Sequence, residues 1–211
     1  RPVEVAPFSE IVAYRNQHAS VNLMEQSLSR EELQALRNKR TGVTVFQISW
    51  IMVFVCLIVV NLQIRSNFPT WPPAGVAPLE WVLPTIATLG LIASTWFARG
   101  ALKALEADRL ASFLGQWRVT LILAVAFVAI MAFEWMTVPE SGQYSTLFRV
   151  MTAFHGLHAL VIGVIMFRVY RTAQAGGYTD ANQMWVVEAG AKLWYFVTIA
   201  WLMFFTVLYI I

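Results

Sequence analysis

The chain is short of charge. Asp, Glu, Lys and Arg make up 13% of its 211 residues, and their net charge is only +3, whereas about 25% of the residues in a soluble domain are charged. Apolar residues account for 58% of the chain and gather in long blocks. A soluble domain with one buried core does not need such blocks, so the composition indicates an integral membrane protein.

Residues with reactive side chains are also scarce. The single cysteine, Cys56, lies in an apolar run and excludes an internal disulfide. Neither a Cys-His-Asp arrangement for nucleophilic catalysis nor a glycine loop for phosphate is present. No basic run interleaved with aromatic residues occurs, which argues against nucleic acid as a partner.

Five apolar stretches are long enough to cross a bilayer as helices. We therefore predict an all-α fold, a polytopic transmembrane bundle of five spans. Prolines, glycines and charged residues separate the stretches. The predicted spans cover residues 43–64, 79–98, 117–138, 146–170 and 185–211.

A polar arm, residues 1–42, precedes this membrane domain of residues 43–211. Ser29 and Glu32 have the spacing of a capping box, and Gly42 is a typical helix stop. We expect a short amphipathic helix between them, lying at the membrane surface. His18, also in this arm, is assigned no role.

Positive residues favour one side of the predicted bundle. Only Arg65 and Arg149 fall on the side of the loops after spans one and three. By the positive-inside rule the N-terminus is cytoplasmic and the C-terminus external. The opposite, positive side holds Arg30, Arg37, Lys39, Arg40, Arg99, Lys103, Arg109, Arg118, Arg168 and Arg171.

The fourth span carries His155 and His158, three residues apart and therefore on one helix face. Ionisable groups at membrane depth need polar partners. Glu134, near the external end of the third span, is within expected reach of His155 for a hydrogen bond. Two histidines on one face cannot bind opposite sides of a haem, and a three-ligand metal site with Glu134 would be strained. A structural polar pair, a proton relay and a lipid contact remain open for these residues.

Charged residues at the cytoplasmic ends of the last two spans are further candidates. Glu188 and Lys192 lie one helical turn apart and are able to pair. Arg168 and Arg171, at the end of the histidine helix, could bind a lipid phosphate or extend to the interface without a defined lipid.

Four segments, in order along the chain, resemble one known family. The most specific is Phe154-His155-Gly156-Leu157-His158, and the others are Trp71-Pro72-Pro73-Ala74-Gly75, Glu134-Trp135, and Glu188-Ala189 with the aromatic residues after it. Together these residues resemble subunit III of the haem-copper oxidases, over roughly residues 43–211.

Several polar positions of that family are changed here. Trp50 stands where the family's first of these helices usually has Glu, and Tyr195 and Thr198 replace the His and Asp of the last helix. Ala87 and Met131 replace an Asn and a Gln. These departures favour a role as a scaffold over a role in proton supply.

The resemblance implies a non-catalytic subunit III of a bacterial terminal oxidase in its five-span form, lying in the cell membrane. Its expected partners are catalytic subunit I, other oxidase subunits and phospholipids. Haem and copper are expected in those partners, with no catalytic, cofactor or metal residue in this chain. The electron donor would be cytochrome c or quinol. Rival interpretations are an accessory subunit of a nitric oxide reductase and a stand-alone transporter.

Overall fold

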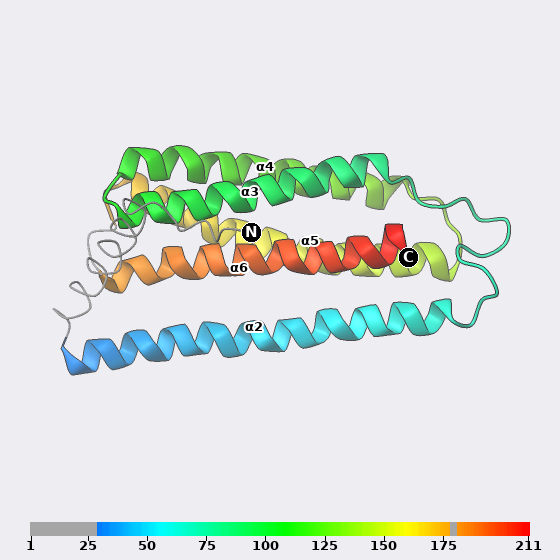
Figure 1. Cartoon of the computed structure of the whole chain (residues 1–211), viewed down its shortest axis with the longest axis horizontal. Coiled ribbons are helices and arrows are strands. Elements are labelled where there is room, and N and C mark those ends of the chain that lie inside the picture. Colours follow the sequence, from blue (N-terminus) through cyan, green and yellow to red (C-terminus); the bar gives the residue numbers. More distant parts are fainter. Residues whose placement is uncertain (1–28, 178–180) are drawn as a thin grey trace, which may run out of the picture.

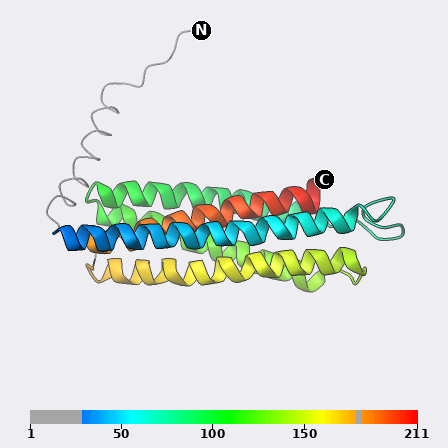
Figure 2. The same ribbon diagram turned by 90° about the horizontal axis from the view of Figure 1, so that it is seen from below.

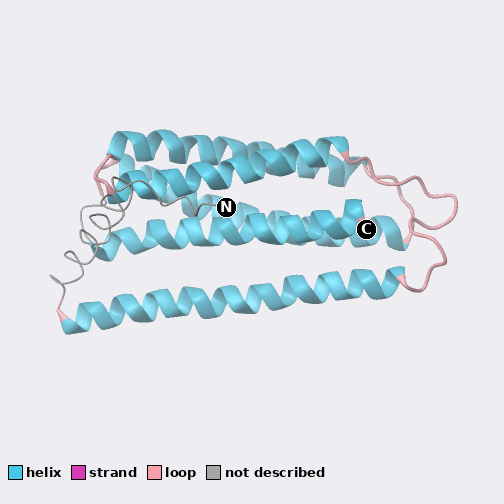
Figure 3. Ribbon diagram, viewed as in Figure 1, coloured by secondary structure: helices cyan, strands magenta, loops and turns pink. Residues whose placement is uncertain are grey.

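The computed structural model describes residues 29–177 and 181–211, which form long helices joined by loops and contain no strand (Figures 1 and 3). Five of these helices are long and apolar enough to cross a membrane, so the predicted all-α fold of five spans is confirmed. They are α2 (Arg30–Arg65), α3 (Val82–Glu106), α4 (Leu110–Thr137), α5 (Gln143–Gln174) and α6 (Ala181–Phe205), which continues as the π-helix η1 (Thr206–Ile210).

Four of the helices, α3 to α6, form the compact part of the bundle (Figure 1). The most extensive packing joins α3 to α4. Ala98, Ala101 and Ala104 of α3 are fully buried. Small residues let two helix backbones approach closely, which is the usual basis of helix packing inside a membrane.

The first helix, α2, lies outside this group. It runs alongside α5 and α6 (Figure 2), and only three of its 36 residues are buried: Leu36, Phe54 and Asn61. Phe54 contacts both of these helices, because its ring lies 5.0 Å from that of Phe154 on α5 and 5.1 Å from that of Phe204 on α6. Most of the surface of α2 therefore faces away from the bundle.

The start of α2 is as predicted, but its end is not. Ser29 accepts a hydrogen bond from the Glu32 backbone N–H at 3.2 Å, and Glu32 accepts one from the Ser29 backbone N–H at 2.9 Å. The expected end at Gly42 is wrong, since the helix continues to Arg65. A glycine inside a helix costs only about 1 kcal/mol, less than leaving backbone groups unbonded where the chain enters lipid.

The connection between α3 and α4 is also shorter than expected. The sequence predicts a polar link from Arg99 to Trp117, but α3 continues to Glu106 and α4 begins at Leu110. The buried alanines continue the apolar stripe of α3 past residue 98. Arg99 and Lys103 therefore lie on the opposite face of the same helix and do not mark its end.

Hydroxyl groups of α3 bond indole and hydroxyl groups of α6 at three levels. Trp194 donates its indole N–H to Ser94 Oγ at 2.9 Å, and Trp201 donates to Thr88 Oγ1 at 2.8 Å. Between them Thr95 and Thr198 share a hydrogen bond of 2.6 Å. Ser94 also donates to the Leu91 carbonyl oxygen at 2.6 Å. These contacts, hereafter the α3–α6 ladder, fix the two helices in register.

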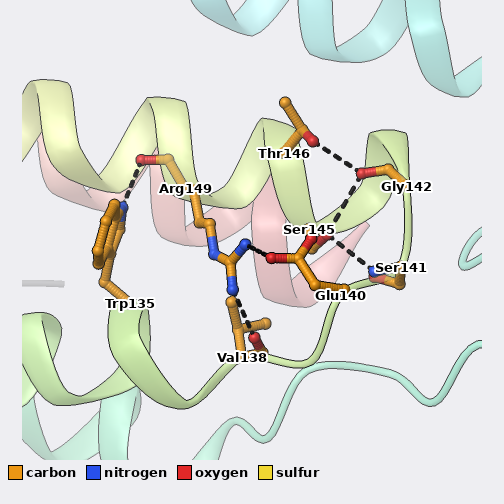
Figure 4. A network of polar contacts seen from close by, with 8 residues as sticks. All are labelled: Trp135, Val138, Glu140, Ser141, Gly142, Ser145, Thr146 and Arg149. Atoms are coloured by element: carbon orange, nitrogen blue, oxygen red, sulfur yellow. Dashed lines mark hydrogen bonds and ion pairs between the residues drawn. The ribbon is translucent and has the colours of Figure 1, made fainter.

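The turn between α4 and α5 is closed by Arg149 (Figure 4). Its guanidinium donates to the Val138 carbonyl oxygen at 2.9 Å and forms an ion pair with Glu140. Trp135 donates its indole N–H to the Arg149 carbonyl oxygen at 3.0 Å. Gly142 occupies the left-handed region with φ 63°, which favours glycine. Arg149, a cation on the predicted external side, thus has a structural role in the hairpin.

The α3–α6 ladder predicts the effect of Ser94→Ala. The substitution leaves the buried Trp194 N–H without an acceptor, so the free energy of unfolding should fall by about 1 kcal/mol. Titration of the protein with a denaturing detergent measures the change. Ser49→Ala is the matched control, because Ser49 is exposed and its hydroxyl donates to the Val45 carbonyl oxygen of its own helix. Equal stability of the two variants would show that the ladder contributes nothing.

Candidate functional site

His155 lies at the centre of the bundle and connects α5 to α6. It is 1% exposed, and its Nε2 donates to the Val197 carbonyl oxygen at 3.0 Å. The rings of Trp201 and Phe127 surround it, with centroids 5.1 and 5.6 Å away. Because a carbonyl oxygen can only accept, this contact places the proton on Nε2. His155 is therefore a bonded, enclosed group between two helices.

His158, one turn further along α5, faces α2 instead. Its Nδ1 donates to the Phe154 carbonyl oxygen of its own helix at 2.7 Å. The Trp50 ring meets it edge-on with centroids 4.4 Å apart, and the Phe54 ring lies at 5.3 Å. The imidazole is half-buried. The two histidines share one helix face, as predicted, and both lie against the Phe54 ring, but His155 bonds α6 whereas His158 bonds a carbonyl oxygen of α5.

The predicted hydrogen bond between Glu134 and His155 is wrong, because His155 bonds α6 and Glu134 bonds neither histidine among the described residues. The reason is depth. Since α5 begins at Gln143, earlier than expected, His155 lies about 18 Å along the helix from its start, at 1.5 Å per residue. Glu134 lies only about 5 Å from the end of α4 by the same count. It lines a cavity at that end of the bundle.

The predicted pair between Glu188 and Lys192 is also wrong. Glu188 accepts from Arg40 of α2, at 3.1 and 3.3 Å for its two oxygens. Lys192 donates to Thr44 Oγ1, again on α2, at 2.9 Å. Lys39 completes the contact 5.5 Å from the centre of the Trp185 ring. These polar contacts attach the N-terminal part of α2 to α6. Spacing along one helix cannot reveal that the partners of Glu188 and Lys192 lie on another helix.

Arg168 and Arg171 lie at the C-terminal end of α5, on the same side of the bundle as the Arg40–Glu188 contact. Both side chains are exposed, and neither has a hydrogen-bond or ion-pair partner among the residues that the structure describes. A lipid phosphate therefore remains a prediction for them. His18 lies outside the described residues.

No set of metal ligands is assembled in the described ranges, 29–177 and 181–211. There, no three side chains of His, Cys, Asp or Glu are close enough together to hold a metal ion.

Three positions that are polar in the resembling family are occupied by packing residues. Trp50 contacts His158, and Thr198 bonds Thr95 in the α3–α6 ladder. Tyr195 packs partly buried against the core. Sequence reasoning noted the change at Trp50 but missed that Trp50 and Phe54, four residues apart on α2, together cover the histidine helix. Their helical spacing was the available signal.

Comparison with known proteins gives a consistent result. The family model described as cytochrome c oxidase subunit III matches residues 15–211. A cytochrome c oxidase subunit 3 from Synechocystis sp. is 28% identical over 174 residues, covering 81% of this chain and 74% of the relative. Its counterpart from Thermostichus vulcanus is 30% identical over 174 residues, covering 81% and 86%. That from Marchantia polymorpha is 29% identical over 184 residues, covering 81% and 67%.

The different surroundings of the two histidines predict unequal effects of the same substitution. His155→Ala removes an inter-helix hydrogen bond and leaves a cavity, so the free energy of unfolding should fall by about 3 kcal/mol. His158→Ala should cost about 1 kcal/mol, since the half-buried ring bonds only its own helix. Denaturing-detergent titration of both variants provides the measurement. A cost for His158→Ala as large as that for His155→Ala would contradict this assignment.

Proposed function

Because the chain belongs to the cytochrome c oxidase subunit III family, we propose that it is the non-catalytic third subunit of a bacterial haem-copper terminal oxidase. That complex takes electrons from cytochrome c or a quinol and reduces dioxygen. The observation that carries this proposal is the match to the family over residues 15–211, nearly the whole chain. Similarity to proteins from Synechocystis and Thermostichus supports a bacterial cell membrane as its location.

The partners follow from the same assignment. The chain packs against catalytic subunit I and other oxidase subunits, which hold the haem and copper, and against phospholipids. Large exposed apolar side chains suit both kinds of neighbour. They occur along α2, as in Phe46 and Met52, and on the outer faces of α4 and α5, as in Val125 and Leu157.

The proposed role is to provide shape rather than to move protons. His155 is bonded within the bundle, and Trp50 places an indole ring against His158 where family members usually carry a carboxylate. An indole N–H donates but does not titrate near neutral pH. This arrangement supports packing at the position and offers no carboxylate to take up a proton.

Gentle extraction tests the assignment directly. When the chain is purified in mild detergent from its native membrane, a haem-bearing subunit should co-elute in equal amount and be identifiable by mass spectrometry. The chain separated from that partner should show no haem absorbance. A chain that elutes without any haem protein, or that keeps a stoichiometric haem or copper of its own, would refute the proposal.

Turnover in the assembled complex separates the scaffold role from a proton role. His155→Ala should lower the fraction of complex that retains this subunit, because the lost imidazole supports the fold. Oxygen consumption per haem in the remaining intact complex should stay within about twofold of the original rate. Removal of a catalytic proton donor would lower the rate by more than that. A loss of about a hundredfold in fully assembled complex would assign His155 to proton transfer.

A further inference from the structure

A cavity of about 600 Å³ opens at the end of the bundle opposite the Arg40–Glu188 contact. The loop before α3, the first turn of α3, the last turns of α4 and the α4–α5 hairpin enclose it. Its lining includes Glu80, Leu83, Phe133, Glu134, Glu140 and Tyr144. By the positive-inside rule this end faces the external side of the membrane. None of the roles assigned above uses it.

Glu134 is the unusual group in this cavity. The residue is 8% exposed, and no group in the described parts of the chain donates a hydrogen bond to its carboxylate. Two other polar groups in the wall are engaged: Glu140 pairs with Arg149, and the Tyr144 hydroxyl accepts from the Leu79 backbone N–H at 3.1 Å. The Glu134 carboxylate lines the cavity and is left without a partner in the described parts of the chain, so a group from outside the chain can pair with it there.

The charge around Glu134 defines what that partner is. Glu80, also negative, lines the same cavity and is exposed. The Arg149 guanidinium is already shared between Glu140 and the Val138 carbonyl oxygen. Three carboxylates line the described cavity, of which only Glu140 is paired, and no lysine or arginine is among the lining residues. An organic cation therefore complements it. The described residues hold no group of three acidic or histidine side chains for a metal ion.

The rim of the cavity is apolar and suited to the membrane interface. Phe133 and Leu83 line the cavity and are 51% and 39% exposed, and Trp81, which follows the lining residue Glu80 in the sequence, is 64% exposed. Tryptophan is enriched at this level of membrane proteins. An occupant must therefore combine an apolar body with a positive tip, as do lysine and arginine side chains that extend from a helix to the interface.

We propose that this cavity receives a lysine or arginine side chain from the external end of a transmembrane helix of another oxidase subunit. Glu134 forms the buried ion pair with it, and Glu80 attracts it at the mouth. The inference rests on the proposed function, because it requires that the chain sits in a multi-subunit complex. It identifies the α3 start and the α4–α5 hairpin as one contact surface of that complex.

Retention of this subunit in the purified complex tests the inference. The complexes carry Glu134→Gln, Glu80→Gln or the control Glu31→Gln, and each is washed with NaCl rising from about 0.1 M to about 1 M, where the Debye length falls to about 3 Å. Glu31 is an exposed carboxylate in the first turn of α2, at the end of the bundle away from the cavity. The fraction of this subunit remaining with the haem-bearing subunit is measured at each step.

Glu134→Gln should release the subunit about tenfold more readily, since it removes one partner of a buried ion pair. Glu80→Gln should have a smaller effect in the same direction, and Glu31→Gln should behave as the unaltered complex. Unaltered complex should lose the subunit as salt rises, whereas the Glu134→Gln complex should be less sensitive to salt. If Glu134→Gln does not accumulate, the surface variant Glu80→Gln and the salt series decide the outcome.

Three results would overturn the inference. If Glu134→Gln is retained like the unaltered subunit, the carboxylate is neutral and has no cation partner, although the proposed function stands. If retention falls only together with loss of phosphatidylethanolamine and returns when that lipid is added, the cation is a lipid amine. If the unaltered chain never co-purifies with a haem-bearing subunit, the proposed function fails first and the inference fails with it.

Discussion

Inside a bilayer no water is available to bond a polar group, and this constraint governs every polar side chain that the bundle buries. The α3–α6 ladder satisfies it at three levels. At two of them a hydroxyl group accepts from a tryptophan N–H and donates to a carbonyl oxygen of its own helix, and at the third Thr95 and Thr198 bond each other. Trp117 meets the same need between α4 and α5 by donating to the Met166 carbonyl oxygen at 2.9 Å. His155 does so between α5 and α6. These polar groups of the interior are internally bonded, which suits a scaffold, whereas Asn61 Oδ1 and the Tyr209 hydroxyl are buried without a partner among the described residues.

The exceptions to this internal bonding lie at the edges of the bundle. The helix α2 is held by the Arg40–Glu188 ion pair at one end and by aromatic contacts of Phe54 along its middle, and most of its apolar surface is left exposed. Glu134, at the opposite end, is buried without a partner among the described residues. Both features are expected of a subunit whose structure is completed by neighbouring chains and lipid. They indicate where those neighbours make contact.

The sequence predicts the fold well because long apolar blocks have few alternatives in a membrane. The number and order of the spans, the helix start at Ser29 and the shared face of His155 and His158 all follow from local pattern. The failures share a physical cause. The end predicted at Gly42, the Glu134–His155 bond and the Glu188–Lys192 pair each depend on how far a helix continues or which neighbour lies beside it. The residue pattern within one helix gives neither the length of that helix nor the identity of its neighbour. Arg40 therefore could not be identified from the sequence as the partner of Glu188.

The central claim is that this chain stabilises an oxygen-reducing complex without contributing a reactive group. The most direct measurement is the initial rate of oxygen consumption per haem in complex stripped of this subunit, compared with the same preparation after the subunit is added back. The account predicts an unchanged haem spectrum and an initial rate within about twofold of the intact complex, a difference below about 0.5 kcal/mol in activation free energy. An initial rate that collapses on removal and recovers fully on addition, with the haem spectrum unaltered throughout, would contradict it.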